Sequence, residues 1–421
     1  MKKRLIKIAL GLVALLLVLM MAIPFFLEGK IADIVKNKVN RNINATLAFE
    51  DANLSLIKSF PDAYLGLQAV SLVNHPPFEG DTLFAAKNIA LELSIKELFK
   101  SQKDPVAIKK LIFDGVLLRI KVDSLENANY DIALTTDQGA GETTNTAPSS
   151  FTFDLNEYAL TNTKIVYDDF TSGMHLEISD MNHTGAGDLS LANSKLQTKT
   201  DALVSFAFAG TEYLIKNPVS LDALVGIDLE QGRYRFLENQ ALINQFPLVF
   251  DGFVKVNEEN QEVDISFNTL SSDFKNFLAV IPESYSRDIE NVATTGNFEV
   301  KGTFKGIVDD SHIPTFDIRI NSDNASFKYP DLPKKVKNVF IDTEIINKTG
   351  ITEDTYVNIN TLSFQIDEDK FNVNAKIRDV LGNTKVNAHA DGQINLANVS
   401  KAYPLPADFD LSGLLNVDIT T

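Results

Sequence analysis

The stretch KNIALELSIKEL, residues 87–98, decides the fold class because apolar and polar side chains alternate along it. Ile89, Leu91, Leu93 and Ile95 point to one face, and the residues between them point to the other. This period of two predicts a β-strand with one apolar and one solvated face. The alternation therefore raises the question of what the apolar face contacts, because few helices able to cover a sheet are predicted.

Similar alternation recurs through most of the chain and predicts a mostly β fold. Val, Ile, Thr and 28 Phe residues favour strands as well. Short helices are predicted at residues 96–102 and 271–285, and a polar turn at 367–370 predicts a hairpin. The predicted strand segments are 45–56, 64–74, 88–95, a pair within 106–123, 202–210, 253–257, 262–270, 296–306, 315–323, 362–379 and 385–396.

The charge balance argues against one class of partner. The chain carries 39 Lys and Arg residues against 56 Asp and Glu residues, a formal net charge of −17. Such a surface repels the phosphate backbone, and no basic patch interleaved with aromatic residues occurs. Nucleic acid is therefore not an expected partner.

The N-terminus predicts a membrane anchor. IALGLVALLLVLMMAIPFFL, residues 8–27, is 20 residues without a charge, about the length that spans a bilayer as a helix. Lys and Arg residues before it predict a single-pass protein with a cytoplasmic N-terminus and its body on the other side of the membrane. A cleaved signal peptide is the alternative. Residues 30–43 have nearly helical apolar spacing, and their basic face suits either lipid headgroups or solvent.

The predicted organisation has four parts. Residues 1–27 form the basic flank and anchor, and residues 28–136 form a first β domain. Residues 137–150, rich in Gly, Ser and Thr, form a linker or a flexible loop. Residues 151–421 form repeated β-structure, and the chain is expected to continue beyond its last strand.

Catalytic and metal-binding patterns are missing from the sequence. The five histidines are scattered, and cysteine is absent, so neither zinc ligands nor a thiolate nucleophile is predicted. Acidic pairs at Asp168–Asp169 and Asp309–Asp310 fit solvated turns as well as ion sites. We therefore expect no enzyme activity, no catalytic residue, no metal and no cofactor.

The apolar faces have three possible destinations. The sheets could pair as sandwiches, close as a barrel, or remain open as a curved trough. The helical anchor and the lack of aromatic girdles argue against an outer-membrane barrel. The alternation by itself favours the sandwich over the trough.

Three stretches resemble the AsmA family of inner-membrane-anchored periplasmic proteins. They are the basic anchor, the block at residues 59–100 with 106–123 and 127–132, and TFDIRINSDNASFKYPDLPKKVKNVFIDTEI at residues 315–345. Together they cover most of residues 1–135 and 295–421. The resemblance implies a chorein-like start followed by an elongated, curved antiparallel β-sheet groove with a few short helices.

The resemblance also implies a function. Such proteins conduct phospholipid along an apolar groove between the inner and outer membranes and support outer-membrane integrity. The implied partners are phospholipid acyl chains, the inner membrane and outer-membrane or periplasmic proteins. The alternative is an assembly factor or scaffold for outer-membrane proteins that acts through sheet edges. The expected groove-lining residues are Ile89, Leu91, Leu93, Leu118, Ile120, Val122, Phe298, Val300, Phe316, Ile318, Ile320, Val373 and Ile377.

Overall fold

The computed structural model shows a mostly β protein, as the alternation predicted. Among the residues that the structure describes, twenty strands belong to one open sheet, and the helices given with bounds beside them are short. The chain forms two compact units, Met1–Lys216 and Asn217–Thr421, which are described separately. The described residues are 20, 22, 24, 32–33, 35–37, 39–99, 106–134, 151–189, 192–208, 210–244, 246–257, 260–269, 273–275, 291–309, 311–380, 383–405 and 411–421.

Most of the predicted anchor and the whole predicted linker at 137–150 lie outside the described residues. Of residues 8–27, only Met20, Ala22 and Pro24 are described, and all three are helical. In the part of the chain that the structure describes, no helix is both long and apolar enough to cross a membrane. The predicted amphipathic helix is present where it is described, between residues 32 and 40.

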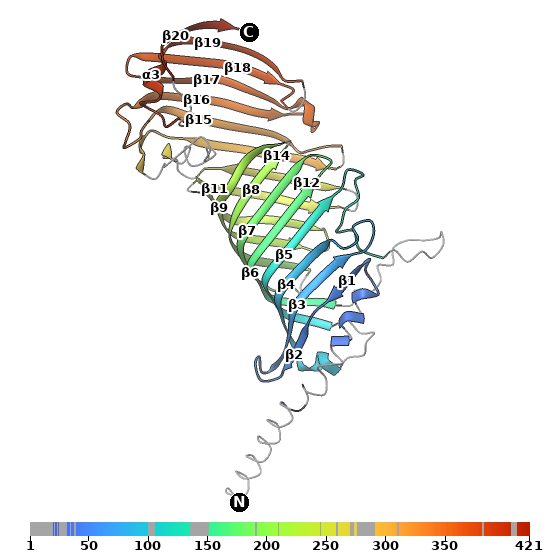
Figure 1. Cartoon of the computed structure of the whole chain (residues 1–421). Helices are drawn as coiled ribbons and strands as arrows, with labels where there is room; N and C mark the ends of the chain where they lie inside the picture. The colour runs from blue at the N-terminus through green and yellow to red at the C-terminus, as the bar shows by residue number, and fades with distance from the viewer. Residues whose placement is uncertain are drawn as a thin grey trace, which may run out of the picture. The chain divides into compact units, whose positions relative to one another are not determined.

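The first unit contains eight strands and the beginning of a ninth (Figure 1). A 3-10 helix, Ile95–Phe99, stands where a short helix was predicted. The strands are β1 (Ala45–Ala48), β2 (Asp51–Ser55), β3 (Asp62–Asn74), β4 (Thr82–Ser94), β5 (Val106–Val122), β6 (Phe151–Asp169), β7 (Met174–Ala186), β8 (Asn193–Phe208) and β9 (Thr211–Asp228), which ends in the second unit.

Pairing in the first unit departs from the predicted antiparallel order at one place. β1 and β2 both pair with β3, and β3, β4 and β5 follow antiparallel. β5 and β6 are parallel, and β6, β7 and β8 are antiparallel again. A parallel pair needs a long crossover, and residues 123–150 provide one. Residues 106–123, predicted as two strands, form the single strand β5.

A crease crosses the first unit at Ala69, Gly115, Asn162 and Asp180, which lie on β3, β5, β6 and β7. Each has a positive φ, between +50° and +64°. A residue in this conformation interrupts the alternation, so the side chains that share a face change across the crease. The register shifts there in the β6–β7 and β7–β8 pairs, whereas the β3–β4 and β4–β5 registers continue unchanged through it. Thus Phe84 on β4 and Phe113 on β5 share a face, with ring centroids 6.1 Å apart. Strict alternation would put them on opposite faces, because the cross-strand partner of Phe113 is Ile89, five residues after Phe84. At Gly115 a Cβ would lie 2.8 Å from the Lys87 Cβ, which explains the glycine.

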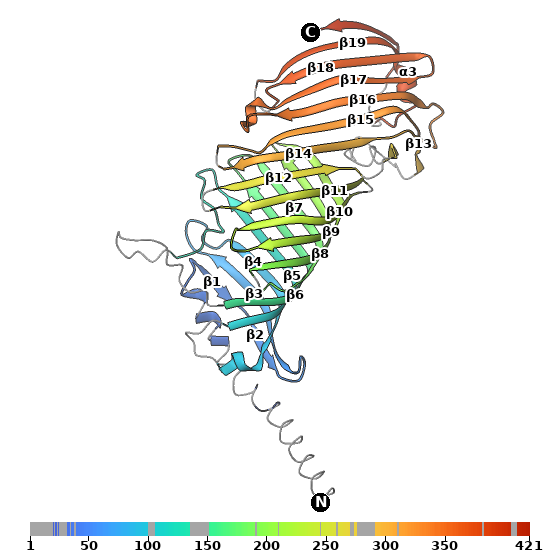
Figure 2. The ribbon, with the colours of Figure 1, turned by 180° about the vertical axis from the view of Figure 1, so that it is seen from behind.

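The second unit is an antiparallel series from the end of β9 to β20, with β13 paired to β15 (Figure 2). The predicted hairpin is confirmed, with its turn between β17 and β18 at Asp367 and Glu368. The strands are β10 (Arg233–Ile243), β11 (Phe246–Val256), β12 (Gln261–Asn268), β13 (Ala293–Thr295), β14 (Glu299–Val308), β15 (Thr315–Lys328), β16 (Val336–Asn347), β17 (Tyr356–Ile366), β18 (Asp369–Arg378), β19 (Lys385–Asn395) and β20 (Leu414–Thr420).

The helices of the second unit are short. Those whose bounds the structure describes are a 3-10 turn, Thr352–Asp354, and α3, Leu396–Val399. The Asn395 side chain caps α3 by accepting a hydrogen bond from the Ala397 N–H. The predicted helix at 271–285 is described only at residues 273–275, of which Lys275 is helical.

Each unit has one buried end on its apolar face. In the first unit, Ala32 and Val35 of the N-terminal helix pack against a buried cluster that includes Leu65 and Leu67. Met20 packs against a neighbouring cluster that includes Leu54 and Leu93. In the second unit the largest buried cluster comprises Phe246, Phe274, Val292, Phe298, Ala325, Phe327, Tyr329, Val336, Val339, Ile341, Ile366 and Ala402. Packed segments therefore cover part of each apolar face.

Candidate functional site

A row of six large apolar side chains crosses the first unit, one from each strand from β3 to β8. Each residue is the direct cross-strand partner of the next, so all six share one face of the sheet. All six are partly exposed, and Phe84 also packs against the buried cluster of the first unit. The six residues of this open row are Leu72, Phe84, Leu118, Ile165, Ile178 and Val204.

A second row runs beside the open row. It consists of Ile120, Tyr167, Leu176 and Phe206, again joined as direct cross-strand partners. These four side chains are also partly exposed. A sandwich core would bury such residues almost completely. The two rows therefore form a continuous apolar surface that is accessible in the structure.

The opposite face of the same strands is charged. Lys164 and Glu177 form an ion pair of 2.9 Å, and Lys110 and Glu157 form one of 3.0 Å. Lys164 adjoins Ile165 on β6, so successive residues belong to opposite faces. The first unit thus presents an apolar surface on one side and a charged surface on the other.

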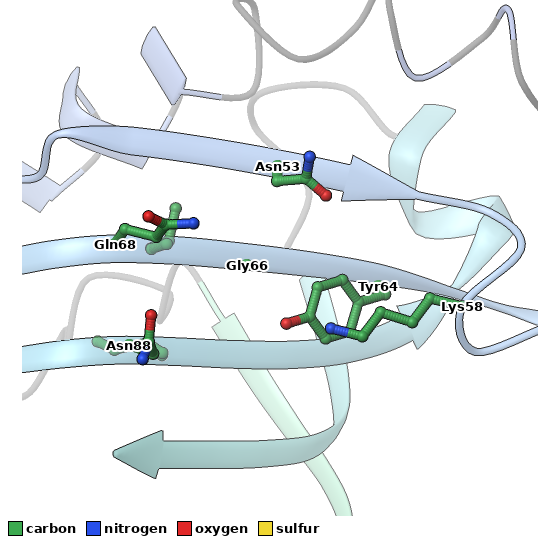
Figure 3. Close-up of a pocket in the computed structure, with 8 residues that line it drawn as sticks. Asn53, Lys58, Tyr64, Gly66, Gln68 and Asn88 are labelled. Atoms are coloured by element: carbon green, nitrogen blue, oxygen red, sulfur yellow. The ribbon is translucent and has the colours of Figure 1, made fainter. Parts of the chain in front are cut away.

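A shallow depression of about 420 Å³ lies on this polar face (Figure 3). Tyr64 and Gly66 line it, and they alternate with the buried residues Leu65 and Leu67 on β3. The Lys58 Nζ lies 3.6 Å from the centroid of the Tyr64 ring, an arrangement suited to a cation–π interaction. The remaining side chains that Figure 3 labels are Asn53, Gln68 and Asn88, and Leu67 and Ile89 complete the lining, so most of the depression is polar.

The second unit repeats the apolar face with aromatic rings. Phe267 and Phe304 stack with centroids 5.6 Å apart, and Phe304 meets Phe316 at 5.9 Å. All three rings are partly exposed. Beside them runs a cross-strand row from β15 to β19 whose members are also accessible. It consists of Ile318, Ile345, Val357, Ile377 and Val386.

The predicted groove-lining residues of the first unit fall into two groups. Leu93 is 4% exposed and belongs to a buried cluster, and Ile89 and Leu91 pack against the buried clusters. Leu118 lies in the open row, and Ile120 in the second row. Val122, partly exposed, follows Ile120 on the same face.

The predicted residues of the second unit divide in the same way. Phe298 is 2% exposed, and Val300 and Ile320 pack against its cluster. Phe316, Ile318 and Ile377 are partly exposed members of the accessible face. Val373, also partly exposed, pairs with Leu362 and Ala390.

Several residues of the open surface escaped the sequence analysis. Ile165 and Tyr167 of β6, and Leu176 and Ile178 of β7, lie in a segment that was not assigned to strands. A signal was present, because Ile165, Val166 and Tyr167 form a short run of β-branched and aromatic residues that favours a strand.

Polar clusters in the described residues show no ion-binding geometry. His175 and Asp168 are 2.6 Å apart, and His312 and Asp309 are 2.8 Å apart, all near strand ends. Hydrogen bonds from Ser311 and His312 lower the pKa of Asp309. No group of three or more His, Cys, Asp or Glu residues among those described is placed to hold a metal. Asp310 lies outside the described residues.

Comparisons with protein families, with characterised proteins and with solved structures find no match for this chain. The candidate site therefore stands on its geometry: two apolar faces, each buried at one end and accessible over several strands.

Proposed function

We propose that this chain is a membrane-anchored periplasmic protein that binds phospholipid acyl chains along its apolar sheet faces. The open row carries this proposal, because six large apolar side chains in register remain accessible on a folded sheet. Large exposed apolar surfaces on a folded protein usually mark binding sites. An acyl chain is a suitable occupant, since each buried CH₂ contributes about 0.8 kcal/mol.

The polar face supports the same ligand class. A lipid tail needs an apolar track, whereas its headgroup needs water. The ion pairs behind the rows keep the opposite face solvated, so a bound lipid would lie on one side of the sheet only. Conduction between the inner and outer membranes is the function that the AsmA resemblance adds to this geometry.

Exposed apolar side chains near the start of the first unit support a membrane location for that end. Ile57 and Phe60, in the turn between β2 and β3, are 52% and 61% exposed. Phe99, after β4, is 66% exposed, and the pairing of Asp62 with Ser94 places both loops at one end of the sheet. Met20 from the apolar N-terminal run packs near this end. These loops could enter the lipid interface beside the anchor.

Adjacent residues on β6 provide a test with a matched control. Ile165 belongs to the open row, whereas Val166 lies on the charged face and pairs with Glu177. Ile165→Asp places a carboxylate in the acyl track, so we expect co-purified phospholipid to fall severalfold. Val166→Asp should leave it unchanged. The measurement is native mass spectrometry of the detergent-extracted full chain.

Two outcomes would contradict the proposal. One is wild-type protein that carries no phospholipid and takes none from vesicles. The other is an equal lipid load in wild-type protein and both folded variants. Either result would leave sheet-edge assembly of outer-membrane proteins as the remaining hypothesis.

A further inference from the structure

Three polar side chains interrupt the apolar face of the first unit. The Tyr158 hydroxyl lies 2.9 Å from His183 Nε2, and His183 Nδ1 lies 2.7 Å from the Thr200 Oγ1. They come from β6, β7 and β8 and form a hydrogen-bonded chain across three strands. We call these residues the polar trio.

The strand register places the polar trio among apolar neighbours. His183 pairs with Leu160, which pairs with Phe113, and Phe113 pairs with Ile89. Tyr158 pairs with Leu111 in the adjacent row. Phe113 and Ile89 pack against the buried cluster, so the polar trio lies where this row leaves the covered part of the face. An acyl chain on the accessible part would therefore reach the polar trio.

The geometry of β7 makes room for the tyrosine. A Cβ at Gly185 would lie only 2.3 Å from the Tyr158 Cε1, so the ring lies across the bare backbone at Gly185. This close approach brings the Tyr158 hydroxyl within reach of His183. All members of the polar trio are partly exposed.

Counting hydrogen atoms shows that the polar trio has an unused donor. Burial lowers the pKa of His183 and raises that of Tyr158, so both groups are held in their neutral forms. The neutral trio then has three polar hydrogens, one on each residue. Its two internal hydrogen bonds use two of them. One hydroxyl hydrogen remains, on Tyr158 or on Thr200 according to the imidazole tautomer.

We infer that the polar trio binds the carbonyl oxygen of an acyl group, and so selects lipids that carry one at the head of an alkyl chain. This inference rests on the proposed function, because it assigns a specificity to the same face. An ester carbonyl of a phospholipid and the carboxylate of a free fatty acid both supply such an oxygen. The free hydroxyl donates to this oxygen while the alkyl chain contacts Leu160 and its apolar neighbours.

The test compares diacyl and dialkyl-ether phospholipids with matched headgroups and chain lengths. The ether lipid lacks the carbonyl, so the wild-type full chain should bind the diacyl lipid about fivefold more tightly. Free fatty acid forms a third arm. If its binding depends on the polar trio and diacyl binding does not, the carboxylate is the source of the oxygen.

The decisive variant replaces all three residues: Tyr158→Phe, His183→Leu and Thr200→Val together. Replacing Tyr158 or Thr200 alone still leaves one polar hydrogen that no hydrogen bond within the trio uses, whereas the triple variant leaves none. Replacing all partners by apolar groups is close to neutral for stability, so folding should survive. The preference for the diacyl lipid over the ether lipid should fall to that of an apolar face without the polar trio. The affinity for the ether lipid should stay unchanged.

The control is Thr184→Val, which makes the same change on the exposed polar face of β7 next to His183. It should retain the wild-type preference. Unchanged preference for every acyl ligand in the triple variant would overturn the inference while leaving lipid binding intact. Failure of wild-type protein to bind either phospholipid or the fatty acid would instead refute the proposed function and this inference together.

Discussion

Leu67 and Ile165 lie on the same face of the first unit but have different surroundings. Leu67 is 6% exposed, within a cluster against which Val35 of the N-terminal helix packs. Ile165 is partly exposed in the open row, with Leu118 and Ile178 as its cross-strand partners. The comparison shows that alternation creates an apolar face, whereas a covering segment turns part of that face into a core.

A charged substitution should reduce stability most strongly at Leu67. Leu67→Asp buries an unpaired carboxylate, so we expect the first unit to lose at least about 4 kcal/mol of stability. Denaturant unfolding of the full chain, followed by circular dichroism, measures this loss. The neighbouring change Gln68→Asp, at an exposed position on the other face, should cost little. Comparable stability of the two variants would show that the cluster is not a core.

The second unit offers the same comparison between two phenylalanines that were both expected to line the groove. Phe298 is 2% exposed and meets Phe246 with centroids 5.8 Å apart, whereas Phe316 is partly exposed. Phe298→Ala should cost about 3–5 kcal/mol, because it removes a buried ring and leaves a cavity. Phe316→Ala should cost about 1–2 kcal/mol, since less apolar area is lost from water.

Thermal and denaturant unfolding of the two alanine variants measure the difference. Lipid load should change in the opposite order, with Phe316→Ala the more damaging of the folded variants. If Phe316→Ala destabilised the unit as much as Phe298→Ala, the accessible face would have to be a buried core instead.

These residues also show what the sequence could predict. The alternation in residues 87–94 correctly indicated a strand with one apolar face, because a period of two leaves few other structures. Ile95, also predicted in that strand, begins the 3-10 helix instead. It could not distinguish Leu93, which is buried, from Leu118, which is accessible. That distinction depends on which segments pack over each strand, and the spacing of apolar residues within a strand carries no information about its cover.

The crease could not be predicted from the sequence, for a different reason. Glycine, asparagine and aspartate tolerate a positive φ, but Ala69 gives no such signal. Across the crease the apolar side changes from odd-numbered to even-numbered residues of β5, so Phe113 joins Ile89 while Leu118 joins Phe84. Alternation read straight through β5 therefore misses Leu111 and Phe113. The polar trio was missed as well, because its members meet only through the register of three strands.

Asp114 joins neighbouring strands at the crease and carries the smallest predicted effect. Its carboxylate accepts hydrogen bonds from Asn162 at 2.9 Å, Thr161 at 2.9 Å and Asn88 at 3.3 Å. The hydrogen bonds from Asn162, then Thr161 and Asn88, lower the pKa of Asp114. A lowered folded-state pKa means that the stabilisation is complete above the unfolded pKa of about 3.9 and is lost as the pH falls through the folded value.

Asp114→Asn should therefore lower the Tm by only about 2 °C near pH 6, because the site is largely solvated. The difference between wild-type and variant Tm should shrink as the pH falls below the unfolded pKa of about 3.9 and through the lowered folded-state pKa, because the wild-type carboxylate then becomes protonated. Differential scanning fluorimetry at a series of pH values measures this difference. Asp51→Asn, at an exposed position of β2, serves as the control. A Tm difference that stayed constant down to low pH would show that Asp114 supports the crease through its shape and not through its charge.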